Sequence, residues 1–224
     1  MSNLIGWCVP ITGFTESENA RRRKIIEQWL PDDVRLEMVP LEGGPKFVDK
    51  RADFNTVEKA GVAFLSKIDP QRYGVLISAG AIDPGLDSLR ASAPVPIIGP
   101  GEAAMFVAAL IGKPLSIVTL DEHAVAVATE LAQHLVVKPK IVSIRSIEMP
   151  ARQIVDDLDA ARAATQRECR AAVRTDGAQA VYLGAMTLGT LGVEDGLRRE
   201  LGVPVLNPIE IALATAVQCL RARQ

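Results

Sequence analysis

Residues 75–90 read VLISAGAIDPGLDSLR, and this stretch decides the class of fold. It begins as a continuous apolar run, breaks at small residues around Gly80, and continues after Asp83-Pro84-Gly85 with helical composition. A continuous apolar run is typical of a parallel strand buried on both faces, and such strands deliver their carboxyl ends to binding sites. Glycine and alanine, rather than a reactive side chain, stand at this predicted strand end.

The rest of the chain repeats this alternation of apolar strand and helical stretch, which predicts an α/β fold with parallel sheets. Strands are predicted at 4–10, 34–41, 74–80, 95–100, 115–120, 140–146, 180–185 and 203–208. Helices are predicted near 15–30, 53–68, 84–92, 101–111, 121–136, 150–175, 193–201 and 209–222.

The two halves of the chain also resemble each other. Residues 75–100 align with 181–208, because both run through a strand, small residues, a short helix and a Val-Pro segment that ends in proline. The repeat predicts two similar Rossmann-like lobes with parallel sheets, related by a pseudo-twofold axis, with a ligand cleft between them. We expect residues 1–98 plus 209–224 in the first lobe and residues 99–208 in the second.

Composition excludes several classes of protein. The 224 residues are 48% hydrophobic with a net charge of −2, which suits two packed lobes and offers no general field for nucleic acid. The apolar runs are too short to span a membrane, and the first residues lack a basic start, so a cytoplasmic location is expected. The three cysteines lie far apart, which argues against a disulfide framework or a metal site. We expect neither a metal nor another cofactor, and a small molecule as the ligand.

Five segments occur in the order and spacing of a known family: ISAGAIDPGL, PIIGPGEAAMFVAALIGKPLSIVTL, IVSIRS, DGAQAVYLGA and ELGVPVLNPIEIA. In them the chain resembles the Asp/Glu/hydantoin racemases, most closely the hydantoin racemase branch. The resemblance implies a cofactor-independent reaction in which one cysteine of each lobe moves a proton on opposite faces of the substrate. It places the first of these cysteines at about Gly80 and the second at Ala185. Neither residue transfers a proton, so the two-thiol mechanism is not expected here.

The cysteines that are present lie elsewhere in the sequence. Cys8 falls near the end of the first strand, and Cys169 and Cys219 lie in predicted helices. Free cysteine is among the most buried residue types, so we interpret all three as packing residues.

Substrate-binding candidates come from the strand ends. Thr12 and Thr119 occupy equivalent places and either bind a carboxylate or cap the helices that begin near 15 and 121. Arg145 matches an arginine of the family pattern and is expected to be a carboxylate clamp or a tie between lobes. The other expected contributors are Gly80, Ala185 and Asn207, the last as an amide donor at the mouth of the cleft.

Three residues are candidates for catalysis. His123 opens the helix after the strand LSIVTL and is the candidate general base, because histidine exchanges protons near neutral pH. Ser78 shares a strand face with Gly80. Thr187 lies just beyond Ala185 in the segment AMTLGTLG, which we interpret as a glycine-rich loop whose amides could hold an anion.

Three hypotheses for function stay open. The first is a cofactor-independent enzyme of this superfamily, acting on a small carboxylate or cyclic amide by isomerase, lyase or hydrolase chemistry. The second is a non-catalytic member that binds a small metabolite, and the third is a racemase variant whose cysteines have been replaced. The polar candidates at the strand ends, which remain although the two cysteines are absent, favour an enzyme. A homo-oligomer is expected, with the apolar face of the 150–175 helix as its interface.

Overall fold

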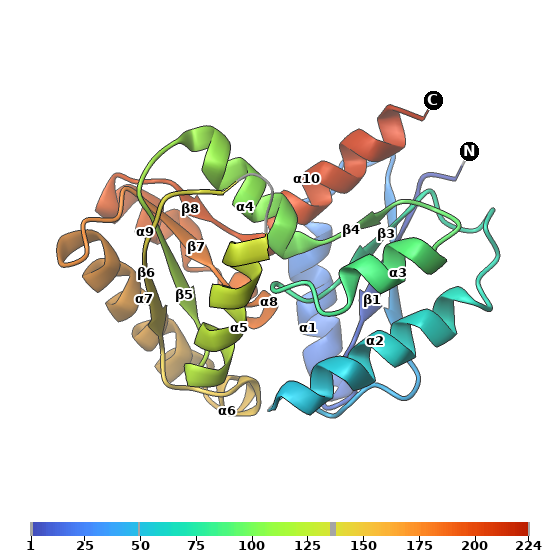
Figure 1. Ribbon diagram of the computed structural model, residues 1–224, viewed down its shortest axis with the longest axis horizontal. Coiled ribbons are helices and arrows are strands. Elements are labelled where there is room, and N and C mark those ends of the chain that lie inside the picture. The colour runs from blue at the N-terminus through green and yellow to red at the C-terminus, as the bar shows by residue number, and fades with distance from the viewer. Residues whose placement is uncertain (1, 49, 135–137, 224) are drawn as a thin grey trace. The chain divides into compact units, whose positions relative to one another are not determined.

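The computed structural model describes residues 2–48, 50–134 and 138–223 (Figure 1). The chain divides into two compact units: unit 1 comprises Met1–Pro100 and Ala212–Gln224, and unit 2 comprises Gly101–Ile211. Each unit contains one four-stranded sheet in which every pairing is parallel. The predicted α/β fold with two similar lobes is therefore confirmed.

Unit 1 has the strand order β2-β1-β3-β4. Its strands are β1 (Leu4–Val9), β2 (Arg35–Pro40), β3 (Val75–Ser78) and β4 (Ile97–Ile98), and its first three helices are α1 (Glu16–Glu27), α2 (Arg51–Leu65) and α3 (Leu86–Ser92). Helices α2 and α3 cover one face of the sheet and α1 lies on the other (Figure 1). This arrangement buries every residue of β3, which explains why its sequence is apolar without alternation.

Unit 2 has the order β6-β5-β7-β8, which is the same topology as that of unit 1. Its strands are β5 (Leu115–Thr119), β6 (Ile141–Ser146), β7 (Ala180–Leu183) and β8 (Val205–Leu206). The helices from here to the end of the chain are α4 (Pro100–Ile111), α5 (Glu122–His134), α6 (Ala151–Asp156), α7 (Leu158–Arg174), α8 (Met186–Gly189), α9 (Glu194–Leu201) and α10 (Pro208–Arg221). The internal repeat is therefore visible as β3-α3-β4 in one unit and β7-α8-α9-β8 in the other.

The predicted helix at 150–175 is instead two helices, α6 and α7. The break is at Asp157, whose backbone is not helical (φ −142°, ψ 85°) and whose side chain accepts a hydrogen bond from the Ala160 N–H at 2.9 Å. Asp157 is thus the N-cap of α7, a role that aspartate favours. The predicted interface is also wrong, because the apolar face of α7, with Ala161 and Cys169 among its residues, is buried in the core of unit 2.

The segment AMTLGTLG also differs from its prediction as a loop. It forms the short helix α8, in which the Gly189 N–H donates to the Ala185 carbonyl at 3.1 Å. The Thr190 hydroxyl then donates to the Thr187 carbonyl at 2.8 Å and closes the turn. The glycines and threonines of this segment favoured a loop, but tertiary packing overrides their weak helix propensity.

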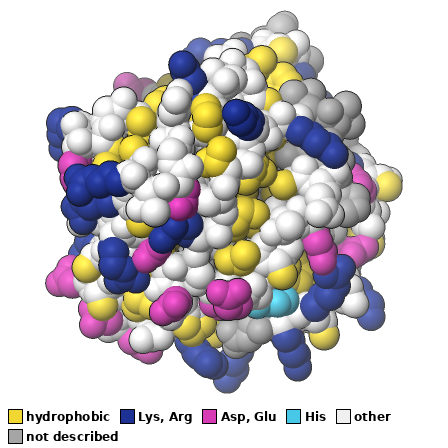
Figure 2. Space-filling model, turned by 60° about the vertical axis from the view of Figure 1, so that its left-hand side comes forward, with side chains coloured by type: hydrophobic (Ala, Val, Ile, Leu, Met, Phe, Trp, Pro, Cys, Tyr) yellow, Lys and Arg dark blue, Asp and Glu magenta, His cyan; other side chains and the backbone are white. Residues whose placement is uncertain are grey.

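The surface drawn in Figure 2 carries charges of both signs. Lys and Arg side chains are interspersed with Asp and Glu side chains and with hydrophobic ones, so no field of a single sign covers this face. Among the described residues, none of the helices combines the length and the hydropathy that a membrane-spanning helix needs.

Candidate functional site

The carboxyl end of β3 is packed too tightly for a side chain at position 80. The Gly80 N–H donates to the Ser78 carbonyl at 2.7 Å, and the Asp83 N–H donates to the Gly80 carbonyl at 3.0 Å, so the chain turns sharply after the strand. A Cβ atom on Gly80 would lie 2.7 Å from Cδ of Pro84. A thiol therefore fits at this position only if the ring of Pro84 shifts.

The carboxyl end of β7 is similarly close-packed but leaves a hydroxyl available. The Gly184 N–H donates to the Val118 carbonyl at 2.8 Å, and a Cβ on Gly184 would lie 2.7 Å from Cγ2 of Ile117. Ala185 follows in extended conformation, and α8 begins at the next residue. Thr187 is only 6% exposed, and its hydroxyl makes no hydrogen bond to any described residue.

Thr119 does not have the free hydroxyl that the sequence analysis expected. It is fully buried, and its Oγ1 donates to the Gly184 carbonyl at 3.2 Å, so it joins the ends of β5 and β7. The alternative capping role is also wrong, because Asp121 caps α5 by accepting from the Ala124 N–H at 2.9 Å. The structure gives Thr119 a packing role, since a buried hydroxyl needs a partner.

Thr12 is exposed in the loop after β1, where its Oγ1 lies 3.4 Å from the Pro45 carbonyl that it approaches as a donor. It does not cap α1, because Thr15 does so by accepting from the Glu18 N–H at 3.2 Å. The long contact with Pro45 leaves Thr12 open to a ligand.

Arg145 is held by two carboxylates of its own unit. Its Nε donates to Glu168 at 2.9 Å and its Nη1 to Asp176 at 2.8 Å. A hydrogen bond from Ser143, together with the guanidinium of Arg145, holds the pKa of Asp176 below its ordinary value. Arg145 therefore takes part in an ion-pair network inside unit 2, and its role as a carboxylate clamp or a tie between lobes stays a prediction.

Asn207 is likewise a structural residue and not the predicted donor at the mouth of a cleft. Its side chain is fully buried, with Nδ2 donating to the Gly189 carbonyl at 2.9 Å and Oδ1 accepting from the Ile209 N–H at 2.9 Å. These two bonds join the end of α8 to the first turn of α10. Both hydrogen-bonding ends of the amide are thus occupied.

Ser78 and Cys8 face the interior of unit 1. They are neighbours in the register of β3 and β1 and line a small apolar cavity beneath α2 and α3. Burial raises the pKa of the Cys8 thiol to about 12. This position argues against the expected catalytic role of Ser78, and it confirms the packing interpretation of Cys8.

The other cysteines are also poor candidates for chemistry. Cys169 is fully buried in α7, and burial raises the pKa of its thiol to about 12. Cys219 is half-buried on α10. Among the described residues, no three His, Cys, Asp or Glu side chains come together as a metal site requires.

His123 lies where the sequence placed it, in the first turn of α5 directly after β5. The residue is partly buried, and its Nε2 atom is shielded from solvent. Its imidazole is thus positioned by a helix that begins at the carboxyl end of a buried strand.

Residues 15–216 match the Asp/Glu/hydantoin racemase family. The chain belongs to this family. The hydantoin racemase of Paenarthrobacter aurescens is 30% identical over 176 residues, which cover 79% of this chain and 71% of that relative. Relatives in the family are enzymes.

Solved structures show the same fold. The allantoin racemase from Klebsiella pneumoniae superposes with a TM-score of 0.87 at 23% identity, over 99% of this chain and 89% of that one. A variant of arylmalonate decarboxylase, in which a glycine is replaced by cysteine and a cysteine by serine, has a TM-score of 0.71 at 18% identity and covers 97% of this chain and 92% of its own.

A buried pair of charged residues on α1 of this racemase-family chain was not predicted from the sequence. The buried face of α1 carries Glu18, Arg22 and Ile26, and the Arg22 Nε donates to Glu18 at 2.7 Å. The Arg22 guanidinium carbon lies 3.8 Å from the centroid of the Phe14 ring, which packs edge-on against Phe47 at 5.7 Å. The spacing of four residues between Glu18, Arg22 and Ile26 was the available signal, because such residues share one helix face.

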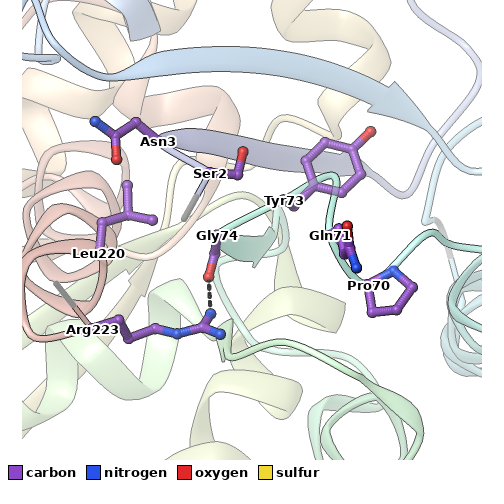
Figure 3. A pocket seen from close by; sticks show the side chains of 8 residues that line it. All are labelled: Ser2, Asn3, Pro70, Gln71, Tyr73, Gly74, Leu220 and Arg223. Carbon is purple, nitrogen blue, oxygen red and sulfur yellow. Dashed lines mark hydrogen bonds between the residues drawn. The ribbon is translucent and has the colours of Figure 1, made fainter.

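Unit 1 also contains a cavity of about 360 Å³, and Figure 3 shows the side chains that line it. It lies at the amino ends of β1 and β3, where the Gly74 N–H donates to the Leu4 carbonyl at 3.0 Å. Arg223 reaches across it and donates to the Gly74 carbonyl at 2.5 Å. The lining residues are Ser2, Asn3, Pro70, Gln71, Tyr73, Gly74, Leu220 and Arg223. None of the predicted site residues is among them.

Proposed function

We propose that this family member is a cofactor-independent enzyme that acts on a small carboxylate or cyclic amide without using two thiols. One observation carries the proposal. Thr187 is only 6% exposed at the end of β7, two residues beyond Ala185, and its hydroxyl makes no hydrogen bond to any described residue. A hydroxyl without a partner inside the described part of the protein, next to the carboxyl end of a parallel strand, lies where α/β proteins bind ligands and so supports a ligand contact there.

The proposed roles follow from the positions of the groups. His123 would accept or return the proton at the reacting carbon, and the Thr187 hydroxyl would donate to the oxygen that gains negative charge. The first N–H groups of α8 have no partner inside the helix and could add to this donor set. The N–H of Gly80 already donates to the Ser78 carbonyl, so this group is not a free donor. Proton abstraction next to a carbonyl, decarboxylation and acyl hydrolysis each place negative charge on an oxygen, which such donors stabilise.

Relatives support the substrate class. The matched racemases are named for hydantoin and allantoin, both cyclic amides, and the matched decarboxylase for arylmalonate, a carboxylate. We extend this range of small carboxylates and cyclic amides to the present chain as part of the proposal.

A non-catalytic metabolite-binding protein is the second candidate. It is favoured by the observation that the side chains of Thr119, Arg145 and Asn207 all form hydrogen bonds inside unit 2. A binding protein needs fewer free polar groups than an enzyme, so these structural roles weaken the argument for catalysis.

Proton exchange in D2O separates the two candidates. The protein is incubated with hydantoins, small 2-substituted carboxylates and unsaturated diacids, and deuterium incorporation and product formation are followed by NMR. We expect enzyme-dependent exchange with at least one compound, and a loss of about 100-fold or more in His123→Ala and about 10-fold or more in Thr187→Val.

The matched control is Thr129→Val, because the Thr129 hydroxyl lies exposed on the same helix as His123 and bonds only to the Val125 carbonyl at 2.8 Å. This variant should keep full activity. Ligand-induced shifts without exchange or product across the whole set would overturn the enzyme proposal and favour the binding protein.

A further inference from the structure

The inward face of α1 is charged where an α/β protein normally places apolar residues. Glu18 and Arg22 are 7% and 6% exposed, and they precede Ile26 on the same face. Taking a carboxylate and a guanidinium out of water costs several kcal/mol per ion in typical proteins, so a buried pair of this kind is weak evidence for stability. The position of the pair points to a role in binding.

Glu18 is shared by two arginines of α1. Arg21 donates to both oxygens of Glu18 at 2.7 Å, and Arg22 donates to the same carboxylate through Nε at 2.7 Å. One carboxylate therefore serves two guanidinium groups. The Nη2 atom of Arg22 is buried and has no acceptor among the described residues. Burial lowers the pKa of Arg22 to about 10, and the group stays protonated at neutral pH.

The surroundings of Arg22 lie at the carboxyl edge of the unit 1 sheet. The loops after β1 and β2 are joined there by hydrogen bonds from the Thr12 N–H to Pro45 and from the Gly13 N–H to Lys46, both 2.9 Å long. These loops carry Phe14 and Phe47, which are half-buried and therefore keep part of their ring surface open. In open α/β sheets this edge is where ligands bind.

We infer that Arg22 binds the carboxylate of a small ligand through its Nη2 group, with the rings of Phe14 and Phe47 as the apolar wall beside it. An anion at this place would supply the acceptor that the Nη2 group of Arg22 lacks among the described residues. That this ligand is the substrate rests on the proposed function. Within the proposed substrate range, the Arg22 site favours an apolar carboxylate over a neutral cyclic amide.

The test compares two probes of the same shape by isothermal titration calorimetry. Phenylacetate carries the carboxylate, and phenylacetamide is its neutral counterpart. We expect phenylacetate to bind the unaltered protein and Arg22→Met to weaken this binding by about 10- to 100-fold, with phenylacetamide weak in both. The matched control is Arg23→Met, because Arg23 is exposed on the same helix and donates to Glu27 at 2.7 Å, outside the cluster; it should keep phenylacetate affinity within about threefold.

Arg22→Lys is the second variant, for use if Arg22→Met does not fold, because it keeps the charge but cannot bond Glu18 and a ligand together. It should weaken phenylacetate binding by about fivefold or more. Equal affinity of the two probes, absence of binding by both, or unchanged affinity in a folded Arg22 variant would overturn the inference. Calorimetry measures binding without turnover, so this test is independent of the proton-exchange assay. If phenylacetate binding depends on Arg22 but no exchange or product is detected in D2O, the proposed enzyme activity is refuted and the proposed binding site is retained.

Discussion

At the scale of single residues, burial and packing decide which groups can react. Cys8 carries the same functional group as the thiols that the family resemblance places at positions 80 and 185. Its apolar surroundings disfavour the thiolate, and only the thiolate is a good nucleophile or base. Gly80 could not be exchanged for cysteine without a shift of Pro84. Local packing, as well as residue identity, therefore disfavours a thiol at position 80.

Alkylation with iodoacetamide tests this account of the cysteines. In the native protein at pH 8 we expect Cys219 to be modified and Cys8 and Cys169 to stay unmodified, because burial keeps both thiols protonated and covered. In urea all three should react. Peptide mass spectrometry gives the extent at each site, and native modification of Cys8 as fast as that of Cys219 would contradict its position in the core.

At the scale of helices and strands, polar side chains act as ties. Thr119 joins β5 to β7, Arg145 joins β6 to α7 and the segment after it, and Asn207 joins α8 to α10. Each of these residues lies at the end of a strand or next to one, where the sequence analysis assigned a substrate contact. Strand ends of α/β proteins need such ties because the chain there leaves the sheet and its backbone groups need new partners.

Asn207→Ala should reveal the strength of one tie. The replacement leaves the Gly189 carbonyl and the Ile209 N–H buried without their partner, so we expect the free energy of unfolding to fall by about 2–4 kcal/mol. Urea denaturation followed by circular dichroism measures the change. Asn19→Ala, on the exposed face of α1, is the control and should change it by less than about 0.5 kcal/mol. If Asn207→Ala changed the free energy of unfolding by a similarly small amount, the amide would not be a structural tie and would be available to contact a ligand.

At the scale of the whole molecule, buried acidic groups make stability depend on pH. Glu194 is buried in the first turn of α9, and desolvation raises its pKa above the ordinary value near 4.5. A carboxyl whose pKa is raised by folding holds its proton more tightly in the native state. Its contribution to stability is therefore complete below pH 4.5 and is lost as pH rises through the higher native value.

Glu194→Gln should remove this pH dependence. Between pH 4.5 and pH 7 we expect the variant to gain stability relative to the unaltered protein, by about 1 kcal/mol in urea denaturation. Glu200→Gln is a control of opposite sign, because its hydrogen bond to Arg170 lowers the pKa of Glu200 and makes its contribution largest at neutral pH. A difference between Glu194→Gln and the unaltered protein that does not vary with pH would contradict this role.

The predicted homo-oligomer also belongs to this scale and stays a prediction. Its expected interface on α7 is buried within unit 2, whereas Phe106 and Leu110, four residues apart on α4, are 50% and 70% exposed. Large apolar side chains exposed side by side on a helix favour a protein contact, so α4 replaces α7 as the candidate surface.

The sequence by itself determined the architecture. All eight predicted strands are present among the described residues, and the repeat of residues 75–100 at 181–208 corresponds to the equivalent order of strands in the two sheets. These features follow from the spacing of apolar residues, which is a local property that the chain carries in its sequence. The absence of cysteine at positions 80 and 185 was equally a matter of sequence.

Only the tertiary structure decided what the polar residues do. Thr119 bonds to a residue 65 positions away, Arg145 to residues 23 and 31 positions away, and Asn207 to one 18 positions away. Nothing in the local sequence encodes such partners, so a threonine that ties two strands together looks the same as one that binds a carboxylate. Arg22 shows the opposite outcome, a proposed binding role that the sequence did not suggest. It is one of three consecutive arginines, and only the folded chain shows that it is buried and that its Nη2 group has no acceptor among the described residues. Hydrogen bonds are formed between neighbours in space, and those neighbours are set by the packing of the whole unit.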